Sequence, residues 1–163
     1  IVYNVPGRTT VNVTPETLKE LSNLENIKGI KEASGNIVQI TEMARLCGDK
    51  IDLYSGNDDH IVPVLSVGGI GVISVVANIA PRDTHDLVMK FLDGDIAGSR
   101  QLQFKLNPLV KALFLEVNPI PVKTALNLIG FDTGKLRLPL TAMADNNLEI
   151  LKQRLTEYGF QLK

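Results

Sequence analysis

A lysine closes an apolar segment of the chain, where a charged side chain needs an explanation. Residues 27–31 have the pattern of a short strand of a parallel sheet, and such strands are buried on both faces. Burial of a lysine favours the neutral amine, because the charged form loses its hydration, and a neutral amine can attack a ketone. Lys31 is therefore a candidate for imine formation. The alternative is a strand-end lysine that reaches solvent or pairs with Glu32.

A tyrosine is predicted to share this site. Tyr3 lies in the apolar segment 1–5, and one strand–helix unit separates it from Lys31, which favours adjacent strands about 4.8 Å apart. Side chains alternate between the faces of a strand, so the Tyr3 hydroxyl and the Lys31 amine could meet on one face. The alternative for Tyr3 is a role in the core alone.

An arginine stands just beyond the first strand segment. Arg8 follows a Pro6-Gly7 turn, at the loop position that faces the substrate in an α/β barrel. A guanidinium there suits recognition of a carboxylate, since the two groups form paired charged hydrogen bonds. The alternative is an arginine that is simply solvated.

The elements that must position these side chains alternate along the first half of the chain. Four apolar segments are each followed by a helical pattern, which predicts βαβ units and a parallel sheet. The strands are expected at 1–5, 27–31, 51–55 and 71–76, with helices starting at Pro15, over 37–47, over 57–65 and starting at Pro81. After Gly94 only helical patterns follow, over 95–113, over 122–129 and up to Tyr158.

This order predicts an α/β domain at 1–94 and an all-helical domain at 95–163. Two architectures fit the first part: a small open α/β sheet, or half of an eight-stranded barrel, since a whole barrel needs roughly 250 residues. Because residues 1–5 already have the pattern of a buried strand, we expect the chain to be a piece of a longer protein.

The composition excludes several classes of protein. The 163 residues are 44% hydrophobic and 21% charged, which is typical of folded domains and not of disordered ones. With 17 basic and 18 acidic residues and no basic run, the chain lacks the charge that nucleic acids or anionic membranes attract. No apolar stretch approaches the roughly 20 residues of a membrane span. The single Cys47 has no partner for an internal disulfide, so we expect a cytoplasmic protein.

Motifs for common cofactors do not occur in the sequence. The segment 68–71 is glycine-rich, but it precedes a strand segment instead of following one, so it does not match the dinucleotide fingerprint. His60 and His85 lie far from Cys47 and from each other, without metal-ligand spacing. We therefore expect neither a metal nor an organic cofactor.

Five segments resemble motifs of the dihydrodipicolinate synthase family, in the family's order and at compatible spacing. The two that carry most of the resemblance are 3–9 (Tyr-Asn-Val-Pro-Gly-Arg-Thr) and 29–36 (Gly-Ile-Lys-Glu-Ala-Ser-Gly-Asn), and the others are 54–58, 69–74 and 118–123. The resemblance covers essentially the whole chain. It implies a (β/α)8 TIM barrel with a C-terminal helical domain, of which this chain would hold the C-terminal half of the barrel and the helical domain.

The resemblance also implies a reaction and the residues that carry it. Pyruvate would condense with Lys31, and the derived enamine would add to L-aspartate-4-semialdehyde, giving 4-hydroxy-tetrahydrodipicolinate on the diaminopimelate route to lysine. Tyr3 would relay protons and Arg8 would bind the semialdehyde carboxylate. By this resemblance, no metal or cofactor would take part. The resemblance further implies a pyruvate-binding region formed by Gly56, Asn57 and Ile73.

Two alternative functions and a set of partners complete the expectations. A related pyruvate lyase, acting on N-acetylneuraminate or a 2-keto-3-deoxy-sugar acid, would share Tyr3 and Lys31, and Arg8 favours the semialdehyde enzyme. An isolated chain could also be an inactive folding or assembly fragment. The family's relay uses a threonine and a partner tyrosine upstream of residue 1, so we expect the missing amino-terminal half or another copy as partner, in a homotetramer or dimer.

Overall fold

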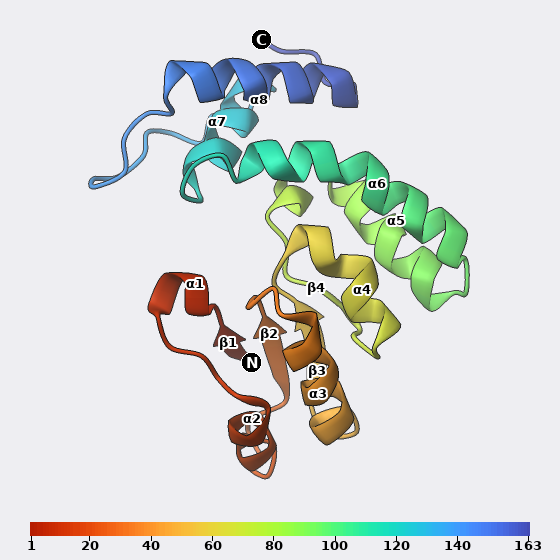
Figure 1. The fold of residues 1–163 in the computed structure, drawn as a ribbon. Helices are drawn as coiled ribbons and strands as arrows, with labels where there is room; N and C mark the ends of the chain where they lie inside the picture. The colour runs from red at the N-terminus through yellow and green to blue at the C-terminus, as the bar shows by residue number, and fades with distance from the viewer. The chain divides into compact units, whose positions relative to one another are not determined.

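The computed structural model describes residues 1–163, and its four strands form one parallel sheet (Figure 1). The strands are β1 (Val2–Asn4), β2 (Gly29–Glu32), β3 (Asp52–Ser55) and β4 (Gly71–Val72), in the spatial order β1-β2-β3-β4. Each strand therefore pairs with the next strand of the sequence. This confirms an α/β fold with a parallel sheet.

Three of the helices between the strands cover one face of this sheet. They are α2 (Pro15–Leu21), α3 (Ile37–Cys47) and α4 (Ile61–Ser66). Right-handed crossovers that always step in the same direction place all their helices on one side, unlike a doubly wound sheet, which has helices on both faces. The core beneath these helices consists of Leu18, Ile30, Ile40, Met43, Cys47, Ile51, Leu53 and Val64. The opposite face, on which Tyr3 is exposed and Lys31 and Tyr54 are half-buried, is the open face of the sheet.

Side-chain alternation explains which residues face the helices. On β1 and β2, Ile30 is 1% exposed against the helices, whereas Tyr3 is 47% exposed on the open face.

Burial raises the pKa of the Cys47 thiol, which lies among apolar side chains of the core.

Polar residues set the helix starts that the sequence predicts. The Thr14 side chain accepts a hydrogen bond from the backbone N–H of Thr17, and Pro15 occupies the first helical position, as expected. Asn36 caps α3 by accepting from the N–H groups of Val38 and Gln39. These caps fix where the two helices begin after β1 and β2.

Two local features differ from the expectation. The strand expected at 71–76 pairs only over Gly71–Val72, and a 3-10 turn follows at Val76–Asn78. The expected Pro6-Gly7 turn is a short helix, α1 (Pro6–Thr9). Proline at the first helical position needs no hydrogen-bond partner for its nitrogen, which suits a helix that starts directly after a strand. Thr10 ends α1 in the left-handed region, with φ of 61°.

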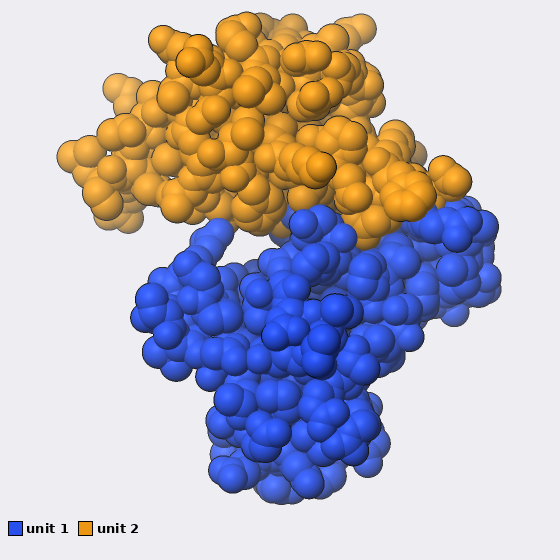
Figure 2. All heavy atoms as spheres, viewed as in Figure 1, with its two compact units in different colours: residues 1–74, 87–100 blue, residues 75–86, 101–163 orange.

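The remaining helices are α5 (Pro81–Leu92), α6 (Ile96–Leu113), α7 (Ile120–Leu128) and α8 (Asp145–Tyr158). The chain divides into two compact units, one of residues 1–74 and 87–100 and one of 75–86 and 101–163 (Figure 2). Each unit consists of two separate segments of the chain, whereas the expected division at residue 94 gives two continuous domains. The expected domains 1–94 and 95–163 therefore remain a prediction.

Within the second unit, a polar cluster joins α5, α6 and α8. The Tyr158 hydroxyl donates a hydrogen bond to the Asp83 carboxylate, and Lys105 Nζ lies 2.6 Å from the same carboxylate. These bonds lower the pKa of Asp83, and the bond from Lys105 has the largest effect. Burial, together with the bond to Asp83, raises the pKa of Tyr158. None of the helices is both long and apolar enough to cross a membrane.

Candidate active site

Lys31 and Tyr3 lie side by side at the carboxyl ends of β1 and β2. They are direct register partners, and Lys31 Nζ lies 4.3 Å from the centroid of the Tyr3 ring. Both side chains point to the open face of the sheet, where Tyr3 is exposed and Lys31 is half-buried. The geometry is that of a cation–π contact. The pattern of the sequence thus brings together the two residues that it singles out.

The contact differs in kind from the one expected. The amine lies over the ring face of Tyr3, whereas the sequence suggested a meeting of amine and hydroxyl. Tyr54 pairs in register with Lys31 from the other side, so the lysine stands between two tyrosine-bearing strands. A half-buried amine on an open face is accessible to a small carbonyl compound, and aromatic neighbours reduce its contact with water.

Arg8 lies in the last turn of α1, directly after β1. Its side chain is exposed, and the backbone N–H of Arg8 donates to Val5 O at 2.9 Å, which closes the short helix. The helix therefore holds Arg8 at a defined place beyond the carboxyl end of β1. A guanidinium at that place is available for a carboxylate.

The segment after β3 contains Gly56 and Asn57. The Gly56 N–H donates to Glu32 O at 2.7 Å, so it extends the ladder between β2 and β3. A Cβ atom at Gly56 would lie 2.6 Å from the Ala33 Cβ, which explains the glycine. Ser55 Oγ donates to Asn57 O at 2.8 Å and accepts from Asn57 N at 3.2 Å, which fixes the turn.

Ile73 stands just beyond β4, where its N–H donates to Ser55 O at 2.9 Å. Its side chain is 37% exposed. The predicted site residues therefore lie at or just beyond the carboxyl ends of the four strands. All of them belong to the first compact unit. Their roles toward a substrate remain predictions.

The sequence reasoning missed a buried polar pair next to Tyr3 and Lys31. Asn4 and Glu32 are each 1% exposed, and Asn4 Nδ2 donates to Glu32 Oε2 at 2.7 Å. The available signal was a polar residue in the strand segment 1–5 and another directly after the segment 27–31, each at a position whose alternation predicts the covered face. Such a residue needs a buried partner.

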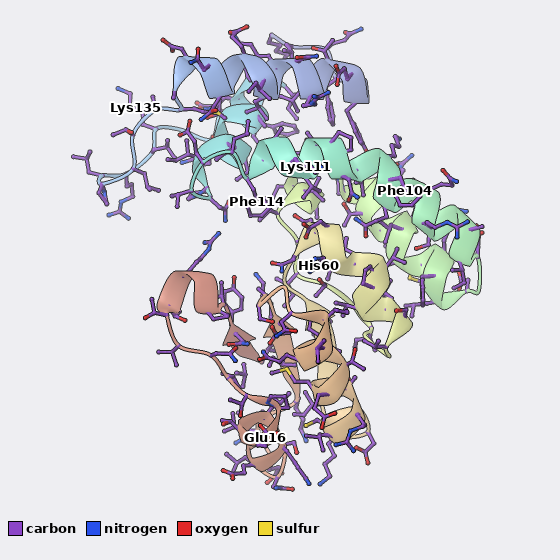
Figure 3. The ribbon with its side chains drawn as sticks, in the orientation of Figure 1. Glu16, His60, Phe104, Lys111, Phe114 and Lys135 are labelled. Atoms are coloured by element: carbon purple, nitrogen blue, oxygen red, sulfur yellow. The ribbon has the colours of Figure 1, made fainter.

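A cavity of about 440 Å³ lies between α6 and α8, and its lining includes Phe104, Lys111 and Arg154. Figure 3 labels the first two of these residues on α6. The cavity belongs to the second unit, whereas the predicted site residues belong to the first.

His60 directly precedes α4. No group of three or more His, Cys, Asp or Glu side chains in residues 1–163 could hold a metal ion.

Comparison with known proteins decides the family. Residues 1–158 match the model of the dihydrodipicolinate synthetase family. The chain belongs to this family. It is 64% identical over 163 residues to the 4-hydroxy-tetrahydrodipicolinate synthase of Caldicellulosiruptor bescii, covering 100% of this chain and 55% of that protein. A synthase of Clostridium perfringens is 55% identical over 159 residues, covering 98% of this chain and 55% of its own length.

About half of each of the following solved structures of this family has the fold of this chain. Dihydrodipicolinate synthase from Thermotoga maritima matches with a TM-score of 0.94 and 48% identity, covering 97% of this chain and 55% of that one. The chloride-inhibited enzyme of Acinetobacter baumannii complexed with pyruvate matches with a TM-score of 0.93 and 38% identity, covering 98% and 55%. The chain spans about half the length of the relatives it matches.

Proposed function

We propose that this chain carries the imine-forming part of a 4-hydroxy-tetrahydrodipicolinate synthase and corresponds to the C-terminal half of its TIM barrel plus the helical domain. The observation that carries the proposal is the Lys31–Tyr3 pair, at the carboxyl ends of adjacent parallel strands and on an open face. Catalytic groups of barrels stand at that end of the strands. Membership of the family and the pyruvate complex of the A. baumannii relative support the choice of substrate.

The chemistry follows from an amine and a ketone. Lys31 Nζ attacks C2 of pyruvate, water leaves, and an imine forms. Loss of a methyl proton gives the enamine, whose carbon bonds to the aldehyde carbon of L-aspartate-4-semialdehyde. The semialdehyde's own amine then displaces Lys31 from C2, which closes the ring and regenerates the free lysine. The imine serves as the electron sink, so the reaction proceeds without a cofactor.

The surrounding residues would divide the remaining tasks. Tyr3 would move protons during imine formation and ring closure, since its ring already contacts the lysine. Arg8 would hold the semialdehyde carboxylate. The segment at Gly56 and Asn57 and the residue Ile73, at the ends of β3 and β4, would border the bound pyruvate. The buried free thiol of Cys47 suits the cytoplasm, where we place the protein.

The second substrate distinguishes this proposal from a related pyruvate lyase. Purified protein should consume pyruvate with L-aspartate-4-semialdehyde and form the cyclic product, followed by mass spectrometry of the reaction mixture. N-acetylmannosamine and glyceraldehyde, the aldehyde partners of the alternative lyases, should give much slower consumption. Faster turnover with either of these two would overturn the choice of semialdehyde, and imine formation without turnover would favour the inactive-fragment alternative.

Replacement of Arg8 should affect the second substrate more than the first. In Arg8→Ala, the semialdehyde concentration needed for half-maximal rate should rise about tenfold or more, because a charged hydrogen bond to the carboxylate is lost. The rate of imine formation with pyruvate should stay within about twofold of the unaltered protein. Arg45→Ala is the matched control, since Arg45 is an exposed arginine on α3 bonded to Glu42. An equal loss for both substrates would show that Arg8 is structural.

The two edge strands predict a partner. β1 and β4 each pair on one side only, and unpaired strand edges attract other strands. We propose that the amino-terminal half of the barrel or a second copy covers them. Light scattering after size-exclusion chromatography should therefore show assemblies heavier than the monomer. A monodisperse monomer with full synthase activity would contradict both the edge argument and the need for the missing half.

A further inference from the structure

The covered face of the sheet contains a buried polar pair beside its apolar core, and Ser55, the register partner of Glu32 on β3, is buried there as well. Asn4 and Glu32 are direct register partners on β1 and β2, and Asn4 bonds to the loop between α1 and α2. Each is 1% exposed. An apolar pair would fill this place without the cost of removing a carboxylate and an amide from water, which is large when their hydrogen bonds are left unmade. A pair of this kind therefore needs a reason beyond packing.

The hydrogen bonds of this pair are complementary and reach into both loops beyond the strands. Asn4 Nδ2 donates to Glu32 Oε2 at 2.7 Å and to Asn12 Oδ1 at 2.9 Å, and Asn4 Oδ1 accepts from Val13 N at 2.9 Å. Glu32 Oε1 accepts from Ser34 N at 2.7 Å. One connected set of bonds thus joins β1, β2, the loop that follows α1 and the turn that follows β2.

The consequence for the site follows from the alternation of strand side chains. Asn4 and Glu32 are the chain neighbours of Tyr3 and Lys31, and the two pairs point to opposite faces. A slip of one residue between the strands would turn Lys31 toward the helices. The Asn4–Glu32 bond opposes any such slip, because the slip would leave both buried groups without hydrogen-bond partners.

We infer that Asn4 and Glu32 are positioning residues for imine formation at Lys31. They hold the register of β1 and β2, and with it the position of the amine against Tyr3, while their bonds to Val13 and Ser34 hold the loops at the same edge. This inference rests on the proposed function. A displacement of about 1 Å at a reacting group can slow a reaction about a hundredfold, so the effect on rate is expected to be measurable.

The complementarity of the pair allows a swap. Glu32→Gln replaces one acceptor by an NH₂ group, which then faces either the Asn4 amide or the Ser34 N–H, donor against donor. Asn4→Asp instead places two carboxylates against each other. The double variant restores one amide and one carboxylate, since the new amide at position 32 can accept from the Ser34 N–H and donate to the new carboxylate at position 4. The exposed Asn12 amide and the half-buried Gln39 amide bond each other, so both can turn over together to suit it, with loss of the long bond from Gln39 Nε2 to Val13 O at 3.5 Å.

The experiment measures imine formation in the full-length protein. The rate constant at saturating pyruvate is followed by rapid mixing, borohydride quenching and intact mass, and the thermal midpoint is recorded for each variant. Each single variant should lower the rate constant about tenfold or more, with the half-saturating pyruvate concentration within about twofold. The double variant should return to within about threefold of the unaltered protein.

A core variant separates positioning from stability. Met43 lies on α3 and is 1% exposed, so Met43→Ala should lower the thermal midpoint and leave the rate constant of the folded protein unchanged. Single variants that lose midpoint but keep their rate constant would overturn the inference, and so would a double variant that folds and stays slow. If the single variants do not fold, the double variant must fold and form the imine, or the inference fails. An unaltered protein that forms no adduct would overturn the proposed function as well.

Discussion

Treatment with pyruvate and borohydride should add one reduced pyruvate unit to the protein, and peptide mapping should place it on Lys31. The expected cause is the position of the amine, over the Tyr3 ring on the open face of the sheet. In Lys31→Ala the adduct should disappear and synthase turnover should fall about a thousandfold or more, because removal of the nucleophile removes the covalent route entirely.

A second lysine provides the control for this experiment. Lys28 is exposed and precedes β2 by one residue, so it has the same side chain in the same part of the chain without a tyrosine partner in register. Lys28→Ala should keep the adduct and the turnover. An adduct that maps to Lys28, or to several surface lysines in equal amounts, would overturn the assignment of Lys31.

A methyl group at Gly56 should disturb both stability and reaction. In Gly56→Ala the new Cβ atom would lie 2.6 Å from the Ala33 Cβ and 3.0 Å from the Glu32 carbonyl oxygen. Neither neighbour is the end of a flexible side chain, so the ends of β2 and β3 must separate. We expect the free energy of unfolding to fall by about 1–3 kcal/mol in a urea titration, with slower imine formation, because β2 carries Lys31.

Gly7 is the matched control for Gly56. It lies in α1, and a Cβ atom there would meet no atom within 4 Å apart from its chain neighbours and the backbone of its own helix. Gly7→Ala should leave the free energy of unfolding unchanged or raise it by up to about 1 kcal/mol, since alanine favours the helix more than glycine does. Equal effects of the two substitutions would show that crowding at Gly56 is relieved without displacement of the strands.

The sequence predicted the parallel sheet and the pairing of Tyr3 with Lys31 because both depend on local patterns. The apolar segments and helix caps fix the element order, and one strand–helix unit between Tyr3 and Lys31 implies adjacent strands. The ring-face contact could not be predicted, because it depends on side-chain rotamers within a correct register. Family resemblance, not periodicity, favoured half a barrel over an open sheet.

The local misses have physical causes as well. α1 is too short to show a helical period, and Pro6-Gly7 is equally typical of a turn. The apolar residues after Val72 have strand propensity, but the chain turns into a 3-10 segment at Val76–Asn78, because tertiary packing decides where a short strand ends. In the sequence alone, Glu32 is only a possible partner of Lys31, since its pairing with Asn4 becomes visible only when the two strands are aligned.

The order of the strands also has a consequence for folding kinetics. Because β1, β2, β3 and β4 pair in the sequence in which they are synthesised, every pairing joins strands that are neighbours along the chain. The entropy lost in closing such short loops is small, and each new strand finds a ready edge as soon as it leaves the ribosome. The sheet can therefore grow in steps of one strand and one helix, as repeat proteins do, so that assembly can begin before the helical segments after β4 have been made.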